Sequence, residues 1–308
     1  MLVPSRSTVM TNAPDILQNR LNAVATEMET VLAQVLPEPA GPQSRIMEAM
    51  AYALLGGGKR LRPFLLIEAA KMLGAETKGI WQAAAALECV HVYSLIHDDL
   101  PCMDDDDLRR GKPTVHKAYD EALAVLAGDA LLTLAFEVLA RDSIHPDANV
   151  RLKLISELAA NSGTHGMIGG QVIDIYASLS EQSETLITHL QALKTGALIH
   201  YAVVAGGQLA GATDEDLGNL STYADALGLA FQIRDDILDV EGDSNVMGKR
   251  TNKDAGLGKA TFVSIYGLEG AKTKAHKLGE QAKNALRPYG EKADILCATV
   301  DFVLNRQK

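Results

Sequence analysis

The sequence predicts an all-α fold, and three observations support this prediction. Apolar residues recur with the spacing of helix faces along most of the 308 residues. Segments that alternate between apolar and polar residues, as strands do, are too short to be useful, and we find no convincing hairpin turn. The hydrophobic content of 47% is ample for a large core, and we see no convincing domain break. We therefore expect residues 13–308 to form one helical domain behind a disordered tail of residues 1–12.

Glycine and proline separate the expected helices. In the first helix Leu17, Leu21 and Val24 share one face, and a proline-rich break at residues 37–42 follows it. Three consecutive glycines at residues 56–58 end the second helix. The expected helices cover residues 14–36, 44–55, 64–73, 80–100, 118–140, 149–178, 184–207 and 221–240, with a helix start at 214–217 and two or three helices in 266–308.

The composition excludes several classes of protein. The chain has 29 basic and 39 acidic residues, and its net charge of −10 argues against nucleic acid as the main partner. The three cysteines have neither zinc-site spacing nor the even number of a disulfide framework. The N-terminus lacks the apolar core of a signal peptide, and no stretch is long and apolar enough to span a bilayer, residues 80–100 coming nearest. We expect a cytoplasmic protein with no membrane span.

The most acidic stretch follows a long apolar segment. Its six aspartates within ten residues are Asp98, Asp99, Asp104, Asp105, Asp106 and Asp107. Crowded carboxylates repel one another unless a cation offsets their charge, and oxygen ligands suit a divalent cation. Arg109 and Arg110 follow at once and would suit a phosphate beside that metal. The alternative is an acidic, solvated loop without a function, and this stretch alone does not decide between the two.

The apolar segment itself, residues 80–100, is hydrophobic nearly all round, so we expect it to be a central helix. Its residues Glu88, His91, Leu95 and Asp98 form a single stripe. His91 then lies two turns from Asp98, roughly 10 Å away. A lone histidine on such a helix is usually a hydrogen-bonded core residue, but on this stripe we expect it to line a cavity.

A basic loop precedes the third expected helix. The three glycines lead into Lys59, Arg60 and Arg62 at a helix N-terminus, where backbone N–H groups also favour an anion. The loop is therefore a candidate phosphate site, although the P-loop pattern is absent. The alternative is a flexible basic loop.

A second acidic cluster lies in residues 221–240. One helix face there carries Gly228, Gln232, Asp235 and Asp239. Asp235 and Asp239 are one turn apart and can approach a common ion, whereas Asp236 points ~100° away. The following loop is rich in glycine and lysine, includes Lys249 and Lys259, and is interpreted as a cationic lid over anions.

Two further segments give weaker signals. Small residues at 166–170 indicate close helix packing, and Gln171 and Asp174 share a face beside them. Lys194 and Thr195 lie in the middle of an expected helix. Taken alone, each of these residues is equally compatible with an ordinary surface position.

Together the clusters predict a metal-dependent enzyme that acts on diphosphates. Two aspartate-rich helix ends that face each other across a bundle could hold several Mg²⁺ ions. The cations suit two diphosphates rather than one, and the apolar helices between them suit a hydrocarbon tail. These cations are Lys59, Arg62, Arg109, Arg110, Lys194, Lys249 and Lys259. No local signature of a nucleophile with histidine is present, so we expect the departing diphosphate to drive the reaction.

The motifs closely resemble those of the short-chain trans-isoprenyl diphosphate synthases, specifically the bacterial farnesyl diphosphate synthase type. The resemblance rests on residues 57–63, 98–104 with 109–111, 170–171 with 174, 194–195, and 232 with 235–239. Each motif is weak alone, but their order and number are specific, and they extend over most of the chain. The resemblance implies an all-α bundle around a central cavity, usually a homodimer. It implies condensation of isopentenyl diphosphate with dimethylallyl and geranyl diphosphate, giving farnesyl diphosphate.

The resemblance also implies residue roles. Isopentenyl diphosphate would bind to Lys59, Arg62, His91 and Arg110. The allylic diphosphate would be held by Arg109, Lys194, Lys249 and Lys259 and by two to three Mg²⁺ ions. The metal ligands would be Asp98, Asp104 and Asp235. The oxygens of Thr195 and Gln232 would stabilise the allylic cation, and the proton would leave to the released diphosphate.

Two of these roles depend on local geometry. Asp98 and Asp104 lie ~240° apart on a straight helix, so Asp104 can join Asp98 only if the helix ends or bulges near Pro101. In a straight helix Asp105 replaces Asp104. Tyr93 and Ser94 match the floor of the family's chain-elongation pocket, and the large Tyr93 should stop growth at the farnesyl chain.

Three alternatives remain. A geranylgeranyl diphosphate synthase would have the same sites and a deeper pocket. A class I terpene cyclase shares the first aspartate motif but does not need the basic loop, and an inactive partner subunit would lack aspartates that this chain has. At the C-terminus, Arg306 and Lys308 could close over isopentenyl diphosphate, although we expect a frayed basic tail.

Overall fold

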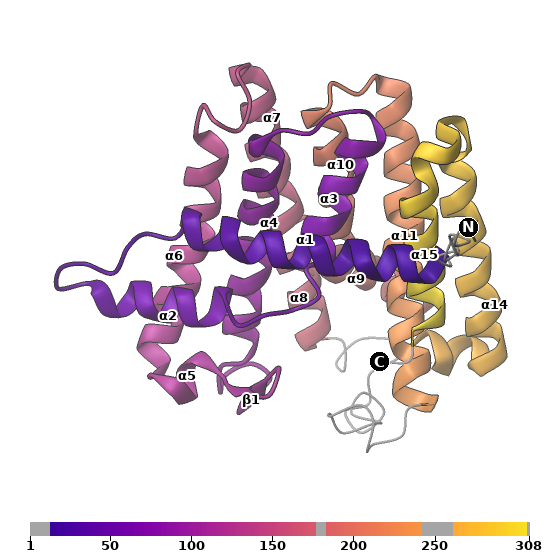
Figure 1. Ribbon diagram of the computed structural model, residues 1–308. Helices are drawn as coiled ribbons and strands as arrows, with labels where there is room; N and C mark the ends of the chain where they lie inside the picture. Colours follow the sequence, from indigo (N-terminus) through magenta and orange to yellow (C-terminus); the bar gives the residue numbers. More distant parts are fainter. Residues whose placement is uncertain (1–12, 177–182, 242–260, 307–308) are drawn as a thin grey trace, which may run out of the picture.

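A computed structural model, which describes residues 13–176, 183–241 and 261–306, shows a bundle of helices (Figure 1). The helices are α1 (Ala13–Val35), α2 (Ser44–Leu54), α3 (Leu61–Met72), α4 (Lys78–Asp98), α5 (Val115–Ala118), α6 (Glu121–Ala140), α7 (Ala148–Ser162), α8 (Met167–Tyr176), α9 (Glu184–Gln191), η2 (Ala192–Gly196), α10 (Ala197–Leu209), α11 (Asp214–Glu241), α14 (Phe262–Ala285), η3 (Arg287–Ala293) and α15 (Asp294–Asn305). The all-α prediction is confirmed. The expected tail and the positions Lys249, Lys259 and Lys308 lie outside the described residues.

Helix α4 is the centre of the packing, as its apolar sequence predicts. It is buried almost throughout, and it packs against α3 and α6, while α10 packs against α3 and α11. Small residues allow close approach: a Cβ on Gly206 of α10 would lie 2.3 Å from the Leu66 carbonyl oxygen of α3. One apolar cluster extends from α1 to α15, and a second joins α9, α11 and α14. Each large apolar side chain buried in these clusters contributes about 1.5–3 kcal/mol.

Three expected helices are divided in the structure, and one of them, residues 184–207, is interrupted by η2. The segment 118–140 breaks because the Asp120 carboxylate accepts a hydrogen bond from the Leu123 N–H at 2.8 Å and so caps the start of α6. The segment 149–178 breaks at a turn in which the Gly166 N–H donates to the Gly163 carbonyl at 3.0 Å. This turn separates α7 from α8.

The expectation that no hairpin turn occurs was wrong at one place. Strands β1 (Leu108–Arg109) and β2 (Lys112–Pro113) pair antiparallel through a two-residue turn. Both turn residues, Arg110 and Gly111, have positive φ, 53° and 77°, as hairpin turns matching the twist of strands require. Arginine rarely adopts this conformation, so the sequence does not signal the turn.

Helix α6 corrects a second expectation. By length and composition Glu121–Ala140 is long and apolar enough to cross a membrane. From the sequence we expected no such segment. The helix packs against α4 along one side and leaves Val125 and Leu126 exposed on the other, 41% and 52% accessible. Core helices of soluble proteins pass the same test, so this is weak evidence for a membrane span.

Candidate active site

The first aspartate motif lies where α4 ends. The helix stops at Asp98, and the chain then folds back so that the Asp104 N–H donates to the Asp98 carbonyl at 2.8 Å. Asp105 adopts a left-handed conformation with φ 50°. The helix therefore ends before Pro101, which is the geometry that the assignment of Asp104 as the second ligand requires.

Asp98 is a partly buried carboxylate in an acidic environment. The Gln171 amide nitrogen on α8 donates to its Oδ1 at 2.9 Å. Burial raises the pKa of Asp98 to about 6, and the charges of Asp104 and Asp99 add to the rise, against the opposing charge of Lys194. The carboxylate is thus mostly ionised at neutral pH, although burial disfavours its charge.

Asp99 has a different role from Asp98. It is 3% exposed, and both of its oxygens accept hydrogen bonds from Arg109 Nε at 2.8 Å. Arg109 Nη2 also donates to Asp99 Oδ1, at 2.5 Å. Asp99 therefore orients the arginine that we predict to hold a diphosphate, and we expect no metal on it.

The predicted isopentenyl diphosphate residues converge at the basic loop. Arg62 Nη1 lies 3.3 Å from His91 Nε2, and Arg110 Nη1 donates to the Gly57 carbonyl. Lys59 is exposed on the same loop. A Cβ on Gly58 would lie 2.7 Å from the guanidinium carbon of Arg110, so this approach needs a glycine.

The electrostatics of this group favour an anion. Burial lowers the pKa of His91 well below its usual value, and the neighbouring Arg62 and Arg110 lower it further. The imidazole is therefore neutral at neutral pH. Arg62 Nε is buried and has no hydrogen-bond partner in the structure. An anion with several oxygens would satisfy such a donor.

Lys194 and Thr195 lie on η2, a π-helical turn between α9 and α10. π-turns inside helices occur frequently at functional sites. Lys194 Nζ pairs with Asp174 Oδ2 of α8 at 2.7 Å, and Thr195 Oγ1 donates to Gln232 Oε1 of α11 at 3.2 Å. Thus α8, η2 and α11 are linked through polar side chains, and Gln171 joins them to α4.

The second aspartate motif separates two roles on α11. Asp236 is buried and accepts a hydrogen bond from the Phe262 N–H at 2.7 Å, so it holds the start of α14. Asp235 pairs instead with Arg306 at 2.6 Å. Arg306 is 9% exposed in its side chain and stacks on Phe231, 3.7 Å from the ring centroid. The expectation of a frayed tail was therefore wrong for Arg306.

The two chain-length residues point in different directions. Tyr93 is 5% exposed, its hydroxyl has no hydrogen-bond partner in the structure, and its ring packs edge-on against His97 at 5.7 Å. Ser94 Oγ donates to the His91 carbonyl at 2.8 Å. The bulk of Tyr93, rather than its hydroxyl, is thus available for closing a pocket.

The donor chemistry around Asp98 fits Mg²⁺. Within the described ranges no three acidic, histidine or cysteine side chains gather closely enough to form a complete metal site. Asp98 and Asp104 nevertheless offer oxygen ligands, and the Gln171 Oε1 atom beside them is buried without a hydrogen-bond partner among the residues that the structure describes. Mg²⁺ normally takes one or two carboxylates and fills its other positions with water and substrate phosphates. Asp98 and Asp104 suit that mode of binding.

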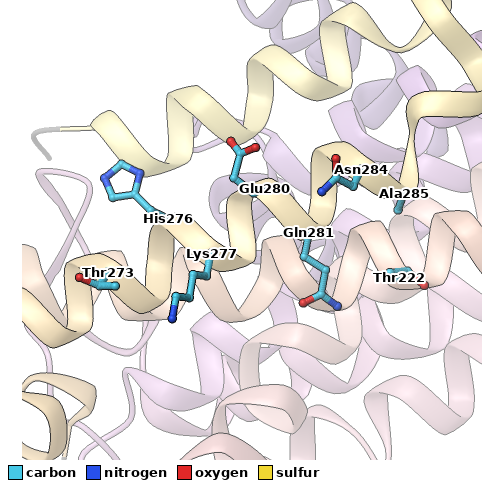
Figure 2. A pocket seen from close by; sticks show the side chains of 8 residues that line it. All are labelled: Thr222, Thr273, His276, Lys277, Glu280, Gln281, Asn284 and Ala285. Atoms are coloured by element: carbon cyan, nitrogen blue, oxygen red, sulfur yellow. The ribbon is translucent and has the colours of Figure 1, made fainter.

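A broad surface hollow elsewhere carries none of this chemistry (Figure 2). It lies on α11 and α14 and is lined by Thr222, Thr273, His276, Lys277, Glu280, Gln281, Asn284 and Ala285. None of the predicted site residues is among them. A smaller cavity does border the site, because Asp99, Arg109 and Arg110 contribute to its lining.

Comparisons with known proteins agree with this site. Residues 43–296 match the polyprenyl synthetase family. The farnesyl diphosphate synthase of Escherichia coli (strain K12) is 43% identical over 94% of this chain and 98% of its own length. The geranylgeranyl diphosphate synthase of Cyanophora paradoxa is 42% identical over 87% of this chain and 90% of its length. A crystal structure of an FPP/GFPP synthase from Zymomonas mobilis superimposes with a TM-score of 0.85, is 44% identical, and covers 94% of this chain and 99% of its own. The chain belongs to the polyprenyl synthetase family.

Proposed function

We propose that the chain condenses isopentenyl diphosphate head-to-tail with dimethylallyl and then geranyl diphosphate, and that the product is (2E,6E)-farnesyl diphosphate. The observation that carries the proposal is that a basic group and an acidic group lie along one helix, and in our proposal each holds one diphosphate, the acidic group through Mg²⁺. His91 belongs to the basic loop group and Asp98 to the acidic group, and they are roughly 10 Å apart along α4. Two adjacent diphosphate sites suit a reaction that joins two diphosphates.

The relatives support the same reaction. Farnesyl diphosphate synthases at 41–45% identity cover most of this chain. Geranylgeranyl diphosphate synthases are similarly related, so identity alone does not set the product length. The buried Tyr93 is the feature that favours the shorter product.

In this mechanism the acidic group holds the allylic diphosphate. Asp98, Asp104 and Asp235 would hold two to three Mg²⁺ ions, which when bound would supply positive charge to offset the charge developing on the leaving diphosphate. Lys194 and Arg109 add fixed cations, Lys194 oriented by Asp174 and Arg109 by Asp99. Lys249 and Lys259 complete this group in our proposal and lie outside the described residues.

The remaining residues guide the carbon chemistry. Lys59, Arg62, His91 and Arg110 hold isopentenyl diphosphate with its double bond toward the allylic carbon. As the allylic C–O bond breaks, that double bond forms the new C–C bond, and a proton then leaves to the released diphosphate. Thr195 and Gln232 direct oxygens at the positive charge. The Gln232 amide is fixed because its nitrogen donates to Asp236 Oδ1 at 3.3 Å.

We also propose a cytoplasmic homodimer. The exposed apolar side of α6, with Val125 and Leu126, would be covered by a second copy of the chain. Free thiols at Cys89, Cys102 and Cys297 suit a reducing compartment.

An end-point assay tests the reaction. Purified protein is incubated with isopentenyl diphosphate, Mg²⁺ and either dimethylallyl or geranyl diphosphate, and the dephosphorylated products are sized by chromatography. We expect farnesol from both substrates. Geranylgeraniol as the main product would retain the mechanism and reject the role of Tyr93. Hydrocarbon formed without isopentenyl diphosphate would indicate a cyclase, and the absence of product would indicate a partner subunit.

A further inference from the structure

Arg60 lies between two predicted substrate ligands, Lys59 and Arg62, but its side chain points into the protein. Its side chain has 0% exposure. Its backbone is left-handed, with φ 47° and ψ 37°, directly before α3. A non-glycine residue rarely adopts this conformation, so something must hold it there.

A network of ion pairs holds Arg60. Its Nη1 atom donates to Glu88 of α4 at 2.6 Å. Its Nη2 atom donates to Glu29 of α1 at 2.7 Å and to the Leu54 carbonyl at 2.7 Å, and its Nε atom donates to Glu29 at 3.1 Å. All three guanidinium nitrogens are thus engaged inside the protein, and Arg60 is not oriented to hold a substrate.

The network connects the basic loop to the helix that carries His91. Glu88 is 2% exposed and lies one turn before His91 on α4. Its charge also reaches the other cations: burial lowers the pKa of both Arg62 and Arg110, and Glu88 is the main group that opposes this effect. Glu88 therefore acts as an internal counter-ion for the basic group.

We propose that Arg60 is a positioning residue, which sets the geometry of Lys59, Arg62 and His91 through its buried ion pairs with Glu88 and Glu29. The inference rests on the proposed function of this group as the isopentenyl diphosphate site. Three flexible glycines precede Lys59, so the loop needs an anchor if its cations are to meet a diphosphate in one arrangement. The forked guanidinium joins two carboxylates at once, which the single ammonium of lysine cannot reproduce.

The test compares Arg60→Lys with Arg20→Lys. Arg20 is a matched control because it also pairs with a buried glutamate, Glu68, at 2.6 Å, between α1 and α3 and away from the loop. For Arg60→Lys we expect KM for isopentenyl diphosphate to rise at least about tenfold, while KM for geranyl diphosphate changes less than about twofold. Arg20→Lys should alter the melting temperature without changing either KM.

A second variant and a binding measurement keep the inference testable if Arg60→Lys does not fold. Glu29→Gln weakens the network from its half-exposed side, 39% accessible, and should raise KM for isopentenyl diphosphate by a smaller factor. Calorimetric binding of inorganic diphosphate, without Mg²⁺, should weaken in both network variants. Equal rises in both KM values, or a lowered melting temperature with unchanged binding, would overturn the inference. If the wild-type protein formed no prenyl product, the proposed function would be rejected. The diphosphate titration would still test whether Arg60 positions the basic group.

Discussion

At the scale of single residues, Asp98 shows a conflict between folding and function. Its pKa is raised from 3.8 to about 6, first by burial and then by Asp104 and Asp99. Between these two values the folded state binds more protons than the unfolded state, so the carboxyl stabilises the fold at low pH. That contribution is lost as pH rises through about 6. At neutral pH the metal-free protein therefore carries a destabilising charge in the place where we propose that it binds metal.

Replacing this charge should stabilise the metal-free protein. We expect Asp98→Asn to raise the free energy of unfolding at pH 7 by on the order of 1–2 kcal/mol, a value reduced for solvent screening. Thermal unfolding at several pH values measures this effect. The difference from wild type should shrink as pH falls through about 6. We expect Mg²⁺ with a diphosphate to raise the melting temperature of the wild type, and the variant should lose this rise. A variant less stable than wild type at pH 7 would contradict the argument.

The end of α4 favours Asp104 over Asp105 as the proposed second metal ligand beside Asp98. Because the Asp104 N–H bonds back to the Asp98 carbonyl, its side chain starts beside the first ligand. We expect Asp104→Ala to lower kcat by about 10²-fold or more and to raise the Mg²⁺ concentration needed for half-maximal rate. Asp105→Ala serves as the control and should change both quantities less than about threefold. If Asp104→Ala were harmless, the assignment would be wrong.

Tyr93 should limit the product length through its bulk. Its ring is buried and its hydroxyl makes no hydrogen bond in the structure, so removing it leaves a cavity without breaking a polar contact. We expect Tyr93→Ala to shift the product from farnesyl to longer chains. The alcohols from extended incubations, separated by chromatography, measure this shift. An unchanged product distribution would show that the pocket is closed elsewhere.

At the scale of helices, the sequence could suggest which residues belong together only where those residues lie on the same element. Arg62 follows a glycine run at a helix start, and His91 lies on the stripe of α4 that ends at Asp98, so spacing alone suggests both. The contact of Arg306 with Asp235 was not predictable, because it joins the end of α15 to α11. The π-turn of η2 was also missed, since its residues fit an ordinary helix equally well.

This π-turn depends on its close contact with α8. A Cβ on Gly170 would lie 2.3 Å from the Lys194 backbone nitrogen, so Gly170→Ala must push the two elements apart. The shift should disturb the ion pair between Lys194 and Asp174 and the hydrogen bond from Gln171 to Asp98. We expect kcat to fall by about 10–100-fold, with KM for the allylic diphosphate raised more than KM for isopentenyl diphosphate. Steady-state kinetics with each substrate varied in turn measures this.

The control for Gly170 is Gly218 on α11. Within the described part of the chain nothing lies within 4 Å of a Cβ built there, and alanine is the better helix former. Gly218→Ala should therefore leave the kinetics unchanged and slightly raise the melting temperature. Equal kinetic losses in both variants would show that the effect of Gly170→Ala is not specific to the contact with η2.

At the scale of the whole molecule, periodicity predicted the all-α class because helix faces repeat in the sequence. The boundaries within residues 118–140 and 149–178 were less predictable, since a single cap at Asp120 and a turn at Gly163 decide them. Composition also pointed to residues 80–100 as the nearest approach to a membrane span, whereas α6 is the helix that meets the criterion. The reason is that α6 carries the exposed apolar residues Val125 and Leu126 in addition to its apolar core side.

The outer side of α6 leads to a prediction about assembly. Leu126 is 52% exposed in the single chain, and a second copy would remove it from water. We expect light scattering to give the mass of a dimer for the wild type, and Leu126→Glu to shift it toward a monomer, because an unpaired carboxylate would be buried. Ile16→Glu is the control, since Ile16 is a similarly exposed apolar residue, 45% accessible, on α1. A wild-type monomer, or a dimer that both variants retain, would show that α6 is not the interface.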